Sequence, residues 1–102
     1  MTEILENKRQ ELADICKSMK IKSLYAFGSV VTENFSDASD LDFLISFTDD
    51  ISVDEYSENY FLLHYKLREL FNREVDIVTE NSLSNPYFIE SINNTKVMIY
   101  EA

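Results

Sequence analysis

Glycine, proline and cysteine each occur only once among the 102 residues, and tryptophan does not occur at all. Roughly seven glycines would be average for this length, so the position of Gly28 needs an explanation. The single cysteine, Cys16, excludes an internal disulfide and a thiolate metal cluster, and we expect it to be a small buried helix residue. No apolar run approaches the roughly 18 residues of a membrane span, and the first residues lack the apolar block of a signal peptide. We therefore expect a soluble, cytoplasmic protein with no membrane association.

Basic residues are also scarce, because nine Lys and Arg stand against nineteen Asp and Glu, for a net charge of −10. Such a charge repels phosphate backbones, and the sequence contains no basic patch, so we expect no nucleic-acid partner. An acidic surface suits a basic protein partner or divalent cations, and it equally suits solubility alone. A chain of this length forms one domain, residues 1–102, and leaves little room for an acceptor pocket unless a homo-oligomer builds it.

The hydrophobic pattern predicts a small α+β fold, an α/β sandwich in which helices flank a sheet. The helix over residues 3–19 has Thr2 as a plausible N-cap, and a turn of helix over 30–33 follows the first strand. The strand over 40–47 alternates between an apolar face and a face that begins with two aspartates. In full, the pattern predicts helices over 3–19, 53–71 and 85–92, and strands over 21–27, 40–47, 74–78 and 96–100.

Polar and acidic residues collect at the strand ends. Gly28 and Ser29 end the first strand in a turn where free backbone N–H groups and a hydroxyl could face an anion. Asp40 and Asp42 point to the same face of the next strand with Cα atoms about 6.5 to 7 Å apart, so they could bind one Mg²⁺ site. If the strand over 74–78 pairs beside them, Asp76 adds a third carboxylate, and three close carboxylates repel one another unless cations lie between them.

Neither short motif is specific by itself, since Gly-Ser is ordinary turn composition and Asp-x-Asp is common at strand ends. At fixed spacing they are specific together. In a chain of this length and average composition, the probability that Gly-Ser, ten residues and Asp-x-Asp occur together by coincidence is below about one per cent.

The stretch GSVVTENFSDASDLD resembles the Gly-Ser-x10-Asp-x-Asp signature of the polymerase-β-like nucleotidyltransferase superfamily, and the short chain is similar to its minimal members, the MNT proteins. The resemblance covers most of the chain and implies that superfamily's fold, a small mixed sheet flanked by helices. It also implies a Mg²⁺-dependent nucleotidyltransferase with ATP as substrate. By resemblance, Asp40, Asp42 and Asp76 are the catalytic residues that bind two Mg²⁺ ions, and Gly28 and Ser29 hold the triphosphate.

MNT proteins are typically paired with a HEPN protein in toxin–antitoxin modules, in which the MNT component, the antitoxin, adenylylates a tyrosine of the HEPN ribonuclease. The resemblance therefore implies a HEPN-type toxin as partner. Two positions depart from the family's pattern, because Val30 stands where a basic residue often follows the serine and Glu33 stands where a second glycine often follows. Loss of the basic residue removes a phosphate contact and Glu33 adds a negative charge nearby, so weak nucleotide affinity or a pseudoenzyme stays open.

Several alternatives remain at this point. The protein is either a protein adenylyltransferase, a non-catalytic acidic antitoxin that covers a basic partner, or a nucleotidyltransferase that modifies a small molecule. His64, the only histidine, is either an acid/base group or a partly exposed helix residue. The aromatic residues of the helix over 53–71 belong either to the core or to a contact surface; these are Tyr56, Tyr60, Phe61 and Tyr65.

Overall fold

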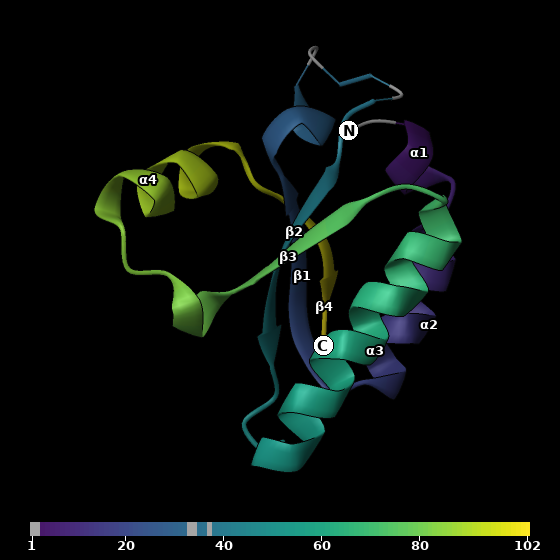
Figure 1. Cartoon of the computed structure of the whole chain (residues 1–102), viewed down its shortest axis with the longest axis vertical. Coiled ribbons are helices and arrows are strands. Elements are labelled where there is room, and N and C mark those ends of the chain that lie inside the picture. The colour runs from purple at the N-terminus through teal and green to yellow at the C-terminus, as the bar shows by residue number, and fades with distance from the viewer. Residues whose placement is uncertain (1–2, 33–34, 37) are drawn as a thin grey trace.

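A computed structural model describes residues 3–32, 35–36 and 38–102 (Figure 1). The expected N-cap Thr2 and the departing residue Glu33 lie outside these residues. The elements follow the predicted order, with one additional short 3-10 helix before the last helix. They are α1 (Glu3–Glu6), α2 (Arg9–Ser18), β1 (Ile21–Phe27), η1 (Gly28–Val31), β2 (Leu41–Phe47), α3 (Val53–Phe71), β3 (Val75–Thr79), η2 (Glu80–Ser82), α4 (Pro86–Thr95) and β4 (Val97–Glu101).

The four strands form one mixed sheet in the order β3-β2-β1-β4. β1 pairs antiparallel with both β2 and β4, whereas β2 and β3 run parallel. The end of β1 therefore lies beside the beginnings of β2 and β3, and the turn η1 lies at that same end of the sheet. This confirms the α+β class and the mixed sheet expected from the sequence.

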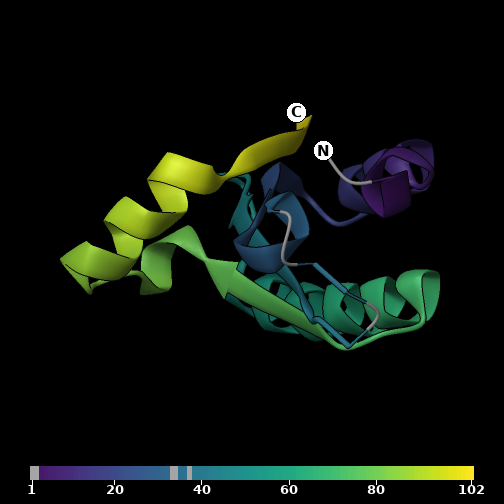
Figure 2. The same ribbon diagram turned by 90° about the horizontal axis from the view of Figure 1, so that it is seen from above.

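Helices cover both faces of the sheet. α2 and α3 lie on one face and α4 on the other, as the view along the strands shows (Figure 2). The larger core lies under α2 and α3 and includes the apolar face of β2, with Leu41, Phe43 and Ile45 fully buried. A smaller cluster of Phe27, Leu44 and their helix neighbour Ile92 lies under α4.

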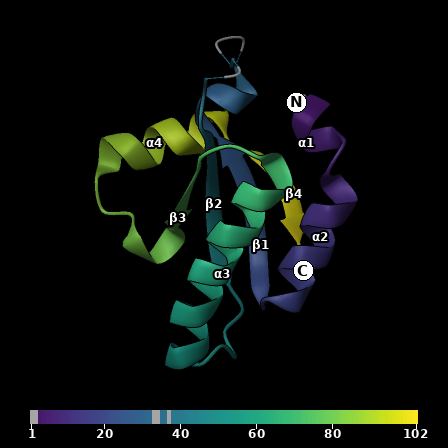
Figure 3. The same cartoon turned by 45° about the vertical axis from the view of Figure 1, so that its right-hand side comes forward.

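The first helix differs from the prediction, because it is two helices joined by a turn at Asn7 and Lys8 (Figure 3). The backbone N–H of Lys8 bonds to the carbonyl of Leu5, three residues back, at 3.2 Å. Asparagine is among the weaker helix formers, which favours the break at this point. Leu5 and Leu12 are both fully buried, so each of the two helices reaches the core.

Strands β2, β3 and β4 differ from the predicted bounds by one residue, and two other elements differ by more. The helical turn after β1 begins at Gly28 rather than at residue 30, because the glycine adopts a positive φ of 76° directly after the strand. Helix α4 runs three residues beyond Ile92, where the Thr95 hydroxyl donates to the carbonyl of Ser91 at 2.9 Å and supports a last, solvent-exposed turn.

No helix in the described part of the chain is both long and apolar enough to cross a membrane. Cys16 is buried in α2, as expected, and burial raises the pKa of its thiol to about 12. A thiol with so high a pKa is a packing residue, not a nucleophile.

Candidate functional site

Two of the three predicted aspartates lie directly opposite each other. Asp42 of β2 and Asp76 of β3 are partners in the parallel pairing, and Phe27, the last residue of β1, is the partner of Asp42 on the other side. Asp40 immediately precedes β2 and is exposed, as is Asp76. The sheet pairing therefore brings all three residues and the Gly28 turn to one end of the sheet.

Gly28 has a steric reason to be glycine. A Cβ atom at this position would lie 3.3 Å from Cγ of Asp42 and would overlap its Oδ2. Its φ of 76° is in the left-handed region that glycine adopts without strain. The sequence indicated a glycine that a phosphate could approach closely, and the structure adds that the carboxylate of Asp42 already approaches it.

Ser29 and Val30 follow Gly28 in η1 and face different surroundings. Ser29 is half-buried, and its carbonyl accepts hydrogen bonds from the backbone N–H and the hydroxyl of Thr32, at 3.0 and 2.9 Å. Val30 is fully buried in the larger core. The position where relatives often carry a basic residue is thus a core position here, and a charged side chain would have to leave the core.

Burial and like charge together shift the ionisation of Asp42. Burial, followed by the negative charges of Asp76 and then Asp40, raises the pKa of Asp42 from 3.8 to about 6. Burial acts on a side chain that is only half-buried, so solvent screens part of this effect. The charges of Asp76 and Asp40 are close enough to oppose ionisation of Asp42.

Among the described residues, which include all three aspartates, no group of three or more His, Cys, Asp or Glu side chains is arranged to hold a metal ion. The donor chemistry nevertheless fits a hard divalent cation, because carboxylate oxygens are the ligands that Mg²⁺ prefers. A cation at this end of the sheet would also relieve the repulsion that raises the pKa of Asp42.

Helix α4 borders the site on the face of the sheet opposite α2 and α3. The ring of Phe88 packs edge to face against that of Phe27, with centroids 6.1 Å apart. Phe27 in turn packs in the smaller core with Leu44 and Ile92. The residue that precedes Gly28 is therefore fixed by α4, which the sequence predicted as a helix but did not place.

The only histidine has a structural contact. Nε2 of His64 lies 2.6 Å from the carbonyl oxygen of Val75 and links α3 to the first residue of β3. This contact is made by α3, which covers the face of the sheet opposite α4 (Figure 2). Of the two interpretations of His64, the structure supports the partly exposed helix residue.

The aromatic residues of α3 divide between core and surface. Tyr56 packs against a phenylalanine of β2 with ring centroids 4.6 Å apart, and the hydroxyl of Tyr60 donates to the carbonyl of Ile77 at 2.9 Å. By contrast, Phe61 and Tyr65 are 70% and 65% exposed. The packing interpretation is therefore correct for Tyr56 and Tyr60, whereas a contact surface at Phe61 and Tyr65 stays a prediction.

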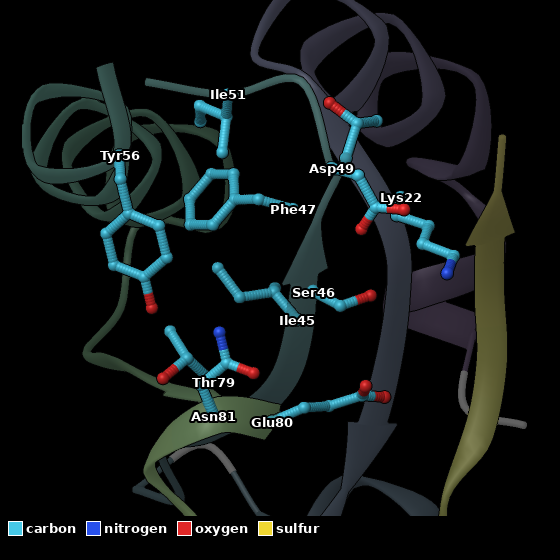
Figure 4. A pocket seen from close by; sticks show the side chains of 11 residues that line it. Lys22, Ile45, Ser46, Phe47, Asp49, Ile51, Tyr56, Thr79, Glu80 and Asn81 are labelled. Atoms are coloured by element: carbon cyan, nitrogen blue, oxygen red, sulfur yellow. The ribbon is translucent and has the colours of Figure 1, made fainter. Parts of the chain in front are cut away.

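A separate cavity of about 360 Å³ lies at the opposite end of the sheet (Figure 4). Phe47 and Thr79, the last residues of β2 and β3, are among its lining residues, whereas Asp42 and Asp76 stand near the beginnings of the same strands. It is not part of the aspartate site. No sequence motif indicates this cavity, because its polar residues are scattered along the chain.

Comparison with known proteins gives close agreement over nearly the whole chain. The sequence model of the family described as "Polymerase beta, Nucleotidyltransferase" matches residues 10–102. A protein of Methanocaldococcus jannaschii named as a candidate protein adenylyltransferase is 32% identical over 99 residues, which make up 97% of this chain and 97% of that protein. A second protein of the same organism and designation is 33% identical over the same shares.

Solved structures share the fold. One described as a candidate minimal nucleotidyltransferase has a TM-score of 0.71 at 25% identity, and the match covers 93% of this chain and 92% of that chain. A chain from the complex of a tri-AMPylated Shewanella oneidensis HEPN toxin with an MNT antitoxin has a TM-score of 0.64 at 16% identity. That match covers 96% of this chain and 73% of the other, and at this identity it shows the fold alone.

Proposed function

The chain belongs to the polymerase-β nucleotidyltransferase family, and from this premise we propose that it transfers AMP from ATP to a hydroxyl group, a tyrosine of a HEPN-type toxin being the acceptor. The observation that carries the proposal is the meeting of the Gly28 turn with Asp42 and Asp76 at one end of the sheet. The motif residues are far apart in sequence, yet the pairing of three strands makes them neighbours.

The nucleotide would bind with its phosphates against the Gly28–Ser29 turn. Gly28 has no side chain and lies against the Asp42 carboxylate, and the Ser29 hydroxyl can donate to a phosphate oxygen. Asp40, Asp42 and Asp76 would hold Mg²⁺, two ions by analogy with the family. Bound Mg²⁺ would neutralise charge on the phosphates and on the aspartates themselves.

In the proposed reaction the acceptor hydroxyl oxygen attacks the α-phosphorus in line with the leaving group. The bond from that phosphorus to the bridging oxygen breaks, and pyrophosphate leaves with the electron pair. The acceptor's proton passes to the carboxylate of Asp76, which is exposed and so can be reached by an acceptor arriving from solvent. Asp42, the strand partner of Asp76, and Asp40 would hold Mg²⁺ beside it.

The choice of acceptor is supported by relatives and by charge. The likeness in fold to a chain from the complex of an AMPylated toxin with its antitoxin makes a protein acceptor the natural choice, as do relatives named as candidate protein adenylyltransferases. The net charge of −10 disfavours a polynucleotide acceptor and favours a partner with a basic surface.

A competing proposal is a non-catalytic antitoxin that neutralises its partner by covering it. One specific observation favours it, namely that the buried Val30 replaces a residue that is often basic in the family. Such a protein would keep its acidic surface and its fold but would bind ATP weakly.

One experiment separates these proposals. The HEPN partner is incubated with this chain, ATP and Mg²⁺, and its mass and ribonuclease activity are measured before and after the chain is removed. A transferase adds AMP to the partner and leaves it inactive after separation, and Asp42→Asn abolishes both effects. Asp49→Asn, at the far end of the sheet, is the matched control with the same loss of charge.

A pure binder gives a different result. The partner's mass stays unchanged, inhibition requires stoichiometric protein, and it weakens as salt rises because the acidic surface carries it. Full inhibition by the double variant Asp40→Asn with Asp42→Asn, with an unmodified partner, would replace the transferase proposal by the binding one.

A further inference from the structure

Arg73 lies across the segment that leads into Asp40, and no sequence motif marks it. Its Nη1 donates to the carbonyl oxygens of Ser36 and Ser39, at 3.2 and 3.0 Å. Its guanidinium carbon lies 4.7 Å from the centroid of the Phe35 ring. Asp40 follows Ser39 directly. The Arg73 side chain, two residues beyond the end of α3, therefore holds the backbone immediately before the first motif aspartate.

Ser36 and Ser39, the two serines whose carbonyls Arg73 binds, are also bonded to each other. The backbone N–H of Ser39 bonds to the carbonyl of Ser36 at 3.0 Å, and the backbone N–H of Ser36 bonds to the Ser39 hydroxyl at 3.0 Å. The next link is made by the backbone, where the N–H of Leu41 bonds to the carbonyl of Glu74 at 3.1 Å. Arg73 and Glu74 thus attach the segment by a side chain and by the main chain.

The same two residues lead directly into β3. Asp76 comes three residues after Arg73, and it is the strand partner of Asp42. The contacts of Arg73 therefore join the two chain segments that carry all three aspartates. Like charges at this end of the sheet favour separation of those segments. Arg73 can keep the segments together and still leave the carboxylates free to bind a cation.

We propose that Arg73 is a positioning residue that holds the Asp40 segment against β3, by binding backbone carbonyls and the Phe35 ring instead of pairing with the aspartates. Its importance for catalysis rests on the proposed function, whereas its effect on the segment does not. Arginine suits this role because its planar guanidinium presents several N–H donors and can stack on an aromatic ring at the same time. A lysine has a compact ammonium that cannot do both.

Arg68 provides a matched control. It lies in the last turn of α3, five residues before Arg73, and pairs with Glu74 at 2.8 Å, and both side chains are largely exposed. Arg68→Ala removes the same charge from the same region and leaves the contacts to Ser36, Ser39 and Phe35 in place. A general effect of charge would appear in both variants. An effect of the contacts that Arg73 makes would appear only in the Arg73 variant.

The first test is amide hydrogen exchange on the chain alone, without nucleotide or partner. We expect the Leu41 amide to exchange about 10-fold faster in Arg73→Ala and in Arg73→Lys than in the native chain, and to be unchanged in Arg68→Ala. Denaturant unfolding of each variant shows whether faster exchange is local or global. Unchanged exchange in Arg73→Ala, or native exchange in Arg73→Lys, would overturn the proposal.

The second test is the transfer reaction. Arg73→Ala should lower kcat about 10- to 100-fold with KM for ATP within about 2-fold of native, because the aspartates are displaced while the Gly28–Ser29 turn is intact. Free guanidinium ion should restore part of the rate, and methylammonium at the same concentration should not. A loss confined to KM, or rescue by both ions alike, would contradict a positioning role. If the native chain transfers nothing, the proposed function fails, and the exchange measurement still decides the role of Arg73.

Discussion

At Gly28 the backbone turns with a φ of 76° beside the carboxylate of Asp42. Gly28→Ala would introduce both a strained backbone and a steric overlap, so we expect it to lower the free energy of unfolding by about 2 kcal/mol and to weaken ATP binding. Urea unfolding and calorimetry with ATP measure the two effects.

Two comparisons separate the backbone from the overlap. Asn72→Ala also places alanine at a positive φ, 52°, and should cost only the backbone part, about 1 kcal/mol or less. In an Asp42→Ala background, Gly28→Ala should cost less than in the native chain, because the overlapping atoms are gone. Equal costs in both backgrounds would show that Asp42 is not the reason for the glycine.

Asp42 gives a prediction about pH. Its pKa is raised from 3.8 to about 6 in the folded protein, so the folded state holds this proton more tightly than the unfolded chain. The contribution to stability is therefore full below about pH 4 and is lost as the pH rises through about 6. Asp42→Asn should be more stable than native by about 1 kcal/mol above that range, after allowance for solvent screening, and no more stable below it.

Urea unfolding near pH 4 and near pH 8 measures this difference. Asp49→Asn serves as the control, because it removes an equal charge from an exposed position far from the site. If the gain in stability from Asp42→Asn is the same at both pH values, or if Asp49→Asn gives the same gain, the raised pKa of Asp42 is not its cause.

The residues of the candidate site differ in how far the sequence could predict them. Gly28, Ser29, Asp40 and Asp42 form a spaced motif, so the chain itself identifies them as a set. Arg73 has no such signal, because its partners are backbone carbonyls, which any residue presents. Contacts to the main chain leave no pattern in the side chains, and only the structure shows them.

At the scale of elements, periodicity predicted strands and the long helix better than helix ends. The bounds of β1 and α3 match the prediction, since the apolar and aromatic run of β1 stops at Gly28 and the apolar spacing of three and four persists to the end of α3. The turn between α1 and α2 was missed because the apolar residues on either side still have helical spacing. The last turn of α4 was missed because it carries no apolar residue.

The beginning of α3 gives a prediction at this scale. The Ser52 hydroxyl accepts from the backbone N–H of Glu55 at 3.1 Å, and the Glu55 carboxylate accepts from the backbone N–H of Ser52 at 3.2 Å. Ser52→Ala should lower the free energy of unfolding by about 1 kcal/mol, because the backbone N–H of Glu55 loses its hydrogen-bond acceptor. Ser57→Ala, the same change at an exposed position inside the helix, should cost nothing. Equal losses in urea unfolding would refute a capping role.

For the molecule as a whole, the balance of charge is the dominant feature. The ion pairs found in the described part of the chain involve Glu6, Asp50, Glu55 and Glu74, all at partly or largely exposed positions. Exposed pairs of this kind stabilise little. A net charge of −10 therefore leaves substantial repulsion, which lowers the stability of the compact state.

Two effects of added salt follow from this repulsion and should be separable. KCl should raise Tm in the native chain and in Asp42→Asn alike, because it screens charge over the whole surface. With ATP present, MgCl₂ at the same ionic strength should raise Tm further in the native chain only, by about 4 to 8 °C for each kcal/mol of binding free energy linked to folding. Thermal unfolding of both proteins in both salts measures this. If Mg²⁺ acts no differently from K⁺, or acts equally on Asp42→Asn, the three aspartates do not form a metal site and the catalytic proposal loses its basis.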